Sequence, residues 1–163
     1  MITRPLPADV GLLDLHRLAP QRYPMLLESA VGGSPRARWD LLLASDGSGL
    51  VQRPGQDVVS LDGDVLGPCF LAALDAQWRG LERPREHESL PFRGGWGLFL
   101  AYELAAQAEP KLQLPDPPAP LPVALALRSP AAIVRDRFSG EVLAVAESGE
   151  DEWLERIATD VER

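Results

Sequence analysis

The sequence of 163 residues is poor in the side chains that most enzymes use for chemistry. It has one cysteine, Cys69, and two histidines, His16 and His87. A single cysteine excludes an internal disulfide, and no group of cysteines and histidines has the spacing of a zinc site. No arrangement of serine, histidine and acid indicates an activated nucleophile. We therefore expect no metal site, no resident cofactor and no catalytic residue in this segment.

Positive charge and long apolar runs are also scarce. Sixteen lysines and arginines face 24 acidic residues, and the net charge is −8. Nucleic-acid backbones need clustered cations, so nucleic acid is excluded as a partner. No apolar run approaches the roughly 20 residues of a membrane helix, so we expect no membrane association and a cytoplasmic protein. The length fits a single domain over residues 1–163.

Short apolar segments separated by turn residues predict β-strands. The expected strands cover residues 23–31, 39–45, 50–53, 58–61, 123–127, 131–135 and 141–146. The turn at 46–49 predicts a hairpin of the strands on either side of it, and the turn at 137–140 predicts a second hairpin. The apolar segment 96–104 is expected to be buried.

Two segments have helical periodicity. In 68–79, Phe70, Leu71, Leu74 and Trp78 fall on one predicted face. In 151–161 the apolar residues again share one side, and the acidic first turn suits a helix start. Together with the strands, these segments predict an α+β fold of mostly antiparallel sheets with two or three packed helices.

The glycine-rich segment Gly94-Gly95-Trp96-Gly97 does not have the pattern of a phosphate-binding loop. It lacks the Lys-Ser/Thr pair that would meet phosphate and magnesium. We interpret it as a backbone bend before a strand, since glycine tolerates conformations that other residues avoid.

Two motifs carry a resemblance to a known family. They are Pro24-Met25-Leu26-Leu27-Glu28-Ser29-Ala30 and Leu90-Pro91-Phe92-Arg93-Gly94-Gly95, the latter continuing to Leu104. In this order the chain resembles the N-terminal domain of the component I enzymes that use chorismate, anthranilate synthase and aminodeoxychorismate synthase. The resemblance covers nearly the whole chain.

The resemblance implies a tryptophan-type pocket. Ser29 would hydrogen-bond the polar end of the ligand, Glu28 would meet its ammonium group, and Arg38 would help to balance charge. The pocket wall and its support would come from Leu26, Leu27, Gly94, Gly95 and Tyr102. A zwitterion needs both an acceptor and a donor, and an indole ring needs an apolar slot. The simpler interpretation is that Glu28 and Ser29 only end a strand at its turn.

The resemblance also implies a catalytic domain and a partner subunit outside this segment. Catalysis in the family belongs to a C-terminal chorismate-binding domain that holds Mg²⁺, and this domain would follow after residue 163. A glutamine amidotransferase subunit would supply ammonia. The segment would then be structural and tryptophan-binding, and inactive alone.

Three hypotheses stay open. The Leu-Pro-Phe-x-Gly-Gly form favours para-aminobenzoate (aminodeoxychorismate) synthase component I, which aminates chorismate to 4-amino-4-deoxychorismate for folate biosynthesis. The Glu28-Ser29 pair is closer to the regulatory domain of anthranilate synthase, in tryptophan biosynthesis. The third hypothesis is a free-standing α+β binding module without an enzymatic parent.

Overall fold

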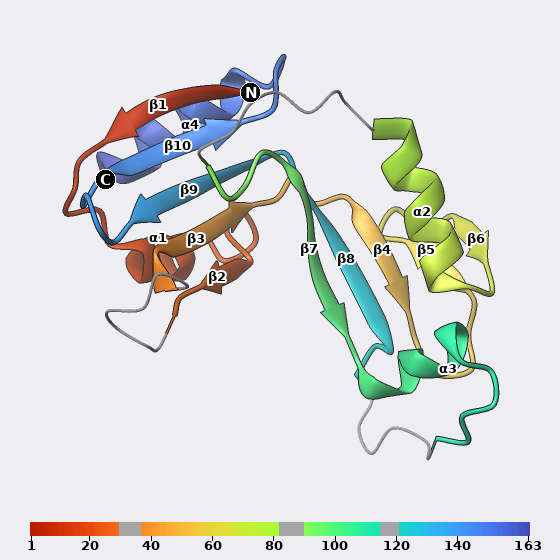
Figure 1. Cartoon of the computed structure of the whole chain (residues 1–163). Coiled ribbons are helices and arrows are strands. Elements are labelled where there is room, and N and C mark those ends of the chain that lie inside the picture. Colours follow the sequence, from red (N-terminus) through yellow and green to blue (C-terminus); the bar gives the residue numbers. More distant parts are fainter. Residues whose placement is uncertain (30–36, 82–89, 115–120) are drawn as a thin grey trace. The chain divides into compact units, whose positions relative to one another are not determined.

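The computed structural model describes residues 1–29, 37–81, 90–114 and 121–163 (Figure 1). Its contacts divide the chain into two compact units. The first unit comprises residues 1–46, 86–95 and 129–163, and the second comprises residues 47–85 and 96–128. Each unit has its own antiparallel sheet and its own helices, which confirms the predicted α+β class.

The first unit is built on a five-stranded sheet with the order β1-β10-β9-β3-β2. Its strands are β1 (Ile2–Leu6), β2 (Met25–Leu27), β3 (Trp39–Ala44), β9 (Ala131–Asp136) and β10 (Val142–Ala146), and all neighbours are antiparallel. Two helices, α1 (Leu12–Leu18) and α4 (Glu152–Val161), belong to this unit.

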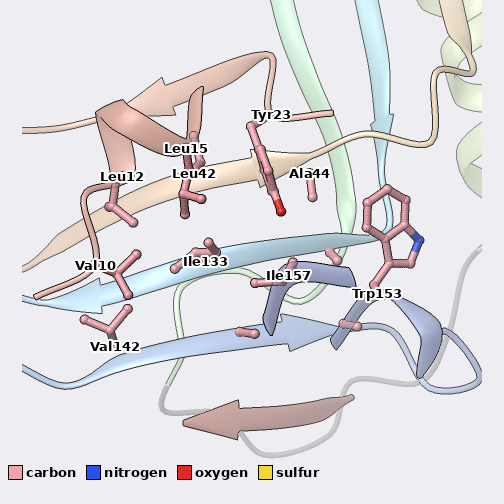
Figure 2. Close-up of a cluster of buried hydrophobic side chains, with 13 residues drawn as sticks. Val10, Leu12, Leu15, Tyr23, Leu42, Ala44, Ile133, Val142, Trp153 and Ile157 are labelled. Atoms are coloured by element: carbon pink, nitrogen blue, oxygen red, sulfur yellow. The ribbon is translucent and has the colours of Figure 1, made fainter. Parts of the chain in front are cut away.

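The main core of the first unit lies between its sheet and these helices. Successive strand residues point to opposite faces, so Leu42, Ile133 and Val142 share one face. Figure 2 shows them facing side chains of α1 and α4, among them Leu12 and Ile157. The amphipathic pattern predicted for 151–161 is confirmed, because Trp153 and Ile157 are buried in this cluster.

A smaller apolar cluster covers the opposite face of the same sheet. Its buried members are Leu43, Ala132, Val134 and Val145. Partly buried apolar side chains pack against them: Met25, Trp39, Leu41, Leu90, Phe92 and Leu143. Both faces of the first sheet are therefore apolar, which fits the continuous apolar runs in β3 and β9.

The second unit has a five-stranded sheet with the order β6-β5-β4-β8-β7. Its elements are β4 (Gly49–Gln52), β5 (Val58–Ser60), β6 (Val65–Gly67), α2 (Phe70–Leu81), β7 (Gly95–Leu100), the 3-10 turn η2 (Tyr102–Leu104), α3 (Ala105–Ala108) and β8 (Ala124–Ser129). Its core comprises Leu50, Val58, Phe70, Ala73, Leu104, Ala124 and Ala126.

A partly buried amide network connects three elements of the second unit. The side-chain nitrogen of Gln107 in α3 donates to Gln52 Oε1 in β4, at 2.7 Å. Gln52 Nε2 donates in turn to the carbonyl oxygens of Gln56 and Pro68, at 3.1 and 2.9 Å. Gln107 Oε1 accepts from the backbone N–H of Leu71 at 3.3 Å, in the first turn of α2. Gln107 thus satisfies a donor that the helix itself leaves free.

The predicted hairpin across residues 46–49 is wrong. Its two strands lie in different sheets, since β3 sits between β2 and β9 whereas β4 sits between β5 and β8. Turn residues mark a change of direction but do not determine which strand pairs with which. The second predicted hairpin is confirmed, with Val142 of β10 opposite Arg135 of β9.

The predicted burial of 96–104 is also wrong for most of that segment. Leu98, Phe99 and Leu100 are 43%, 41% and 48% exposed, because β7 lies at the edge of its sheet.

The apolar face predicted for the helix α2 is only partly covered. Trp78 is 48% exposed, and on α2 only Phe70 and Ala73 are buried. Helical periodicity identifies an apolar face, but how much of that face is covered depends on the neighbouring elements.

Candidate functional site

The first predicted motif follows the short edge strand β2. Leu26 is paired with Leu42 and packs against the main core, whereas Leu27, opposite Leu41, is 47% exposed. Glu28 is exposed and Ser29 is half-buried immediately after the strand. The predicted strand over 23–31 is thus confirmed only at its centre, and residues 30 and 31 lie outside the described ranges.

Arg38 lies just before β3 and is held by a carboxylate. Its Nε and Nη2 donate to Asp136 Oδ2 at 3.0 and 2.6 Å, and its guanidinium stacks 4.3 Å from the ring centre of Trp39. The hydrogen bonds from Arg38, together with the backbone N–H of Phe138, lower the pKa of Asp136 from 3.8 to about 2. The charge of Arg38 is therefore balanced within the protein.

A second arginine anchors the segment that carries Ser29. Arg137 Nε lies 2.8 Å from Oδ1 of the buried Asp40, and Arg137 Nη1 donates to the carbonyl oxygen of Ser29 at 2.8 Å. The hydrogen bond to Asp40 raises the pKa of Arg137, and the nearby charge of Glu28 raises it slightly further. The backbone N–H of Arg137 also donates to the carbonyl oxygen of Arg38, at 2.8 Å.

The sequence analysis missed Asp40, Asp136 and Arg137. Asp40 is a single charge in an apolar strand, whereas Asp136 and Arg137 belong to the charged run Arg135-Asp136-Arg137 before a turn. Charged residues are usually solvated. Only the register of β3 with β9, which sets Trp39 opposite Asp136, brings them beside Arg38 and Ser29. The two arginines and two carboxylates form a connected group around the predicted site, which we call the Arg38–Arg137 cluster.

The second motif reaches the same sheet. Leu90 and Phe92 pack on the smaller apolar cluster, to which Met25 of the first motif also contributes. Gly94 and Gly95 have φ values of +100° and +137°, which side chains other than glycine rarely adopt, and a Cβ at Gly94 would clash with the side chain of Glu147. The predicted bend is confirmed. Tyr102 belongs to the second unit, where it is 76% exposed.

The two histidines do not contribute to a candidate site in the part of the chain that the structure describes. His16 Nδ1 donates to the carbonyl oxygen of Tyr23 at 2.7 Å, and His87 lies outside the described residues. Over the described ranges, no three His, Cys, Asp or Glu side chains converge as metal ligands. In the same ranges no helix has the length and apolar character to cross a bilayer.

A shallow surface groove occurs in the first unit, but away from the predicted site. It is lined by Thr3, Arg4, Asp151, Glu152, Leu154 and Glu155. These residues come from β1 and from the start of α4, and β1 is at the opposite edge of the sheet from β2. Arg4 and Glu155 form an ion pair of 2.8 Å across the groove. The groove therefore has no connection with Glu28 or Ser29.

The Arg38–Asp136 pair predicts a defined pH dependence. The pKa of Asp136 is about 2 in the folded chain, below its ordinary 3.8, so the pair contributes stability above pH 4 that is lost as the pH falls towards 2. We expect Asp136→Asn to be less stable than the unaltered chain at pH 6, and this difference to shrink by pH 2. Urea unfolding at several pH values measures it. Asp62→Asn, in an exposed turn, controls for net charge, and a difference that does not change with pH would contradict the prediction.

The comparisons with known proteins support the fold. No protein-family profile matches the sequence, and no curated protein is similar to it in sequence. Among solved structures, anthranilate synthase component I from Streptococcus pneumoniae TIGR4 is similar, with a TM-score of 0.57 and 22% identity. The match covers 89% of this chain and 33% of that chain. The chain thus shares its fold with about a third of a component I enzyme.

Proposed function

We propose that this chain is the N-terminal, non-catalytic domain of a chorismate-using synthase of the component I type. The observation that carries the proposal is the meeting of the two motifs on one sheet, where Leu90 and Phe92 pack with Met25. The fold similarity to anthranilate synthase component I over 89% of the chain supports it. The scarcity of catalytic side chains fits a role in structure or ligand binding.

Within this class we propose aminodeoxychorismate synthase as the parent enzyme. The Leu90-Pro91-Phe92-Arg93-Gly94-Gly95 form supports this choice. The parent would aminate chorismate with ammonia from a glutamine amidotransferase subunit, and Mg²⁺ would be held by its chorismate-binding domain. Anthranilate synthase is the second candidate, favoured by the Glu28-Ser29 pair and by the identity of the structural neighbour.

The decisive experiment uses the complete open reading frame from which this chain is translated. Its purified product is incubated with chorismate, an ammonium salt and Mg²⁺, and the products are identified by mass spectrometry. 4-Amino-4-deoxychorismate is the expected product, and anthranilate would select the second candidate. A frame that codes for no chorismate-binding domain, together with no turnover, would overturn the proposal in favour of a free-standing binding module. The chain of 163 residues serves as the control and should be inactive.

We further propose that Glu28, Ser29 and Arg38 belong to a tryptophan-type pocket in this domain. Ser29 is half-buried, and its backbone is fixed by the 2.8 Å hydrogen bond from Arg137. Glu28 is exposed and available to an ammonium group. Because Asp136 already holds Arg38, this arginine would orient the site and balance its charge, while other donors meet the carboxylate of the ligand.

Ser29→Ala tests this pocket. We expect it to weaken tryptophan binding to the complete protein by about 2 kcal/mol, or about 30-fold, since a buried polar group of the ligand would lose its partner. Isothermal titration calorimetry measures the affinity. Ser139→Ala, in the exposed turn between β9 and β10, is the matched control. An affinity unchanged by Ser29→Ala would remove Ser29 from the site.

A further inference from the structure

All three residues of the proposed tryptophan-type pocket lie beyond the pairing of β2 with β3. That pairing has three residues in each strand and ends with Leu27 opposite Leu41. Glu28 and Ser29 follow β2, and Arg38 precedes β3. The hydrogen bonds of this ladder therefore do not determine how Ser29 and Arg38 lie relative to each other.

Arg137, directly after β9, contacts both Ser29 and Arg38. Its backbone N–H donates to the carbonyl oxygen of Arg38 at 2.8 Å, which continues the pairing of β3 with β9 one residue beyond Trp39 and Asp136. Its side chain reaches past β3, which lies between β9 and β2, because Nη1 donates to the carbonyl oxygen of Ser29 at 2.8 Å. A single residue thus connects the two parts of the pocket.

The side chain of Arg137 is held in place by a buried carboxylate. Its Nε lies 2.8 Å from Oδ1 of Asp40, whose side chain is 4% exposed in the interior strand β3. A buried carboxylate without a cation is strongly destabilising, so this pair is maintained. The donors of a guanidinium form a rigid planar fork. The position of Nε beside Asp40 therefore directs Nη1 to the carbonyl oxygen of Ser29.

We infer that Arg137 is a positioning residue for the ligand of this pocket. The inference rests on the proposed function, and it adds a residue that neither sequence motif contains. Arg137 is occupied by Asp40 and by the carbonyl oxygen of Ser29, so it acts through the backbone of Ser29 and does not meet the ligand itself. A backbone that is already held in the binding conformation loses less freedom when the ligand binds, and this raises the affinity.

Arg137→Lys tests the inference with the charge retained. A lysine has one ammonium group on a flexible stem, and it should remain beside the buried Asp40 rather than hold Ser29. We expect the dissociation constant of L-tryptophan for the complete protein to rise about tenfold, the scale of one hydrogen bond from a charged group. Isothermal titration calorimetry measures it. Urea unfolding should show a smaller loss of stability than for Arg137→Gln, which leaves Asp40 without a cation.

A double variant separates positioning from direct contact with the ligand. If Arg137 acts through Ser29, the losses from Ser29→Ala and Arg137→Lys are not additive. The double variant should bind L-tryptophan about as weakly as Ser29→Ala alone, which is expected to bind about 30-fold more weakly than the unaltered protein. Additive losses, about 300-fold in total, would mean that Arg137 acts independently of Ser29 and would overturn the inference.

Arg4→Lys is the matched control. Arg4 also forms an ion pair of 2.8 Å, with Glu155, and its side chain is 39% exposed against 30% for Arg137. It lies on β1, at the opposite edge of the sheet from β2, so its replacement should leave the affinity unchanged. An unchanged affinity in Arg137→Lys, with the loss in Ser29→Ala intact, would overturn the inference and leave the pocket standing. No binding of L-tryptophan by the unaltered protein would overturn the pocket itself, and the inference with it.

Discussion

Replacement of Phe70 by alanine is expected to lower the free energy of unfolding of the second unit by about 4 kcal/mol. Phe70 is fully buried at the start of α2 and belongs to a core with few members. Three of the other buried members are alanines, Ala73, Ala124 and Ala126, which are too small to move into the vacated space. The cavity would therefore persist, and the loss should be near the middle of the usual range for Phe→Ala.

Trp78→Ala is the matched control for this prediction. Trp78 is a larger aromatic residue on the same helix, but it is 48% exposed. Its replacement should cost less than about 1 kcal/mol, because little apolar area leaves a buried environment. Urea unfolding followed by circular dichroism measures both variants. Equal losses for Phe70→Ala and Trp78→Ala would mean that α2 does not pack as described.

Replacement of Asp160 by alanine should destabilise the first unit by about 3 kcal/mol. Asp160 is 4% exposed on α4, where its Oδ2 accepts a hydrogen bond of 2.8 Å from the hydroxyl of Tyr23 and forms an ion pair with Arg22. Burial, followed by the hydrogen bond to Asp160, raises the pKa of Tyr23, so the hydroxyl stays neutral and needs an acceptor. Loss of Asp160 would leave that buried donor without its partner.

Two further variants separate the hydrogen bond that Asp160 accepts from its charge, and a buried carboxylate from an exposed one. Asp160→Asn retains an oxygen acceptor for Tyr23 but loses the charge that faces Arg22, so it should cost less than Asp160→Ala. Glu152→Ala removes an exposed carboxylate from the same helix, where it pairs with Arg156 at 3.0 Å, and should cost about 0.5 kcal/mol. A loss for Asp160→Ala no larger than that for Glu152→Ala would contradict a structural role for the buried carboxylate.

Features determined by neighbours in the sequence could be predicted. The turn at 137–140 lies directly between the strands that it joins, and the predicted hairpin is β9 and β10. The apolar side of 151–161 is the buried side of α4, because the apolar residues of that segment recur at helical spacing. The bend at Gly94 and Gly95 could be predicted because only glycine tolerates such φ values at little cost.

Features that depend on distant pairing could not be predicted. The turn at 46–49 carries the same signal whether it closes a hairpin or, as here, leads from one sheet to the other. β1 was missed because Pro5 interrupts its pattern, and such a strand is recognisable only from its position at a sheet edge beside β10. The pairing of Arg38 with Asp136 depends on the register of β3 and β9, which no local pattern encodes.

The order of strands in the first sheet has a consequence for synthesis on the ribosome. β1, β2 and β3 are translated first, yet β9 and β10, which lie between β1 and β3, are translated only after the whole second unit. At about 10 residues per second this delay is about 8 seconds, which is long compared with the formation of a helix or hairpin. The second unit can therefore fold while the nascent first unit still lacks its middle. During that interval the apolar strand β3 lacks its neighbour β9, so side chains that are later buried are exposed to solvent.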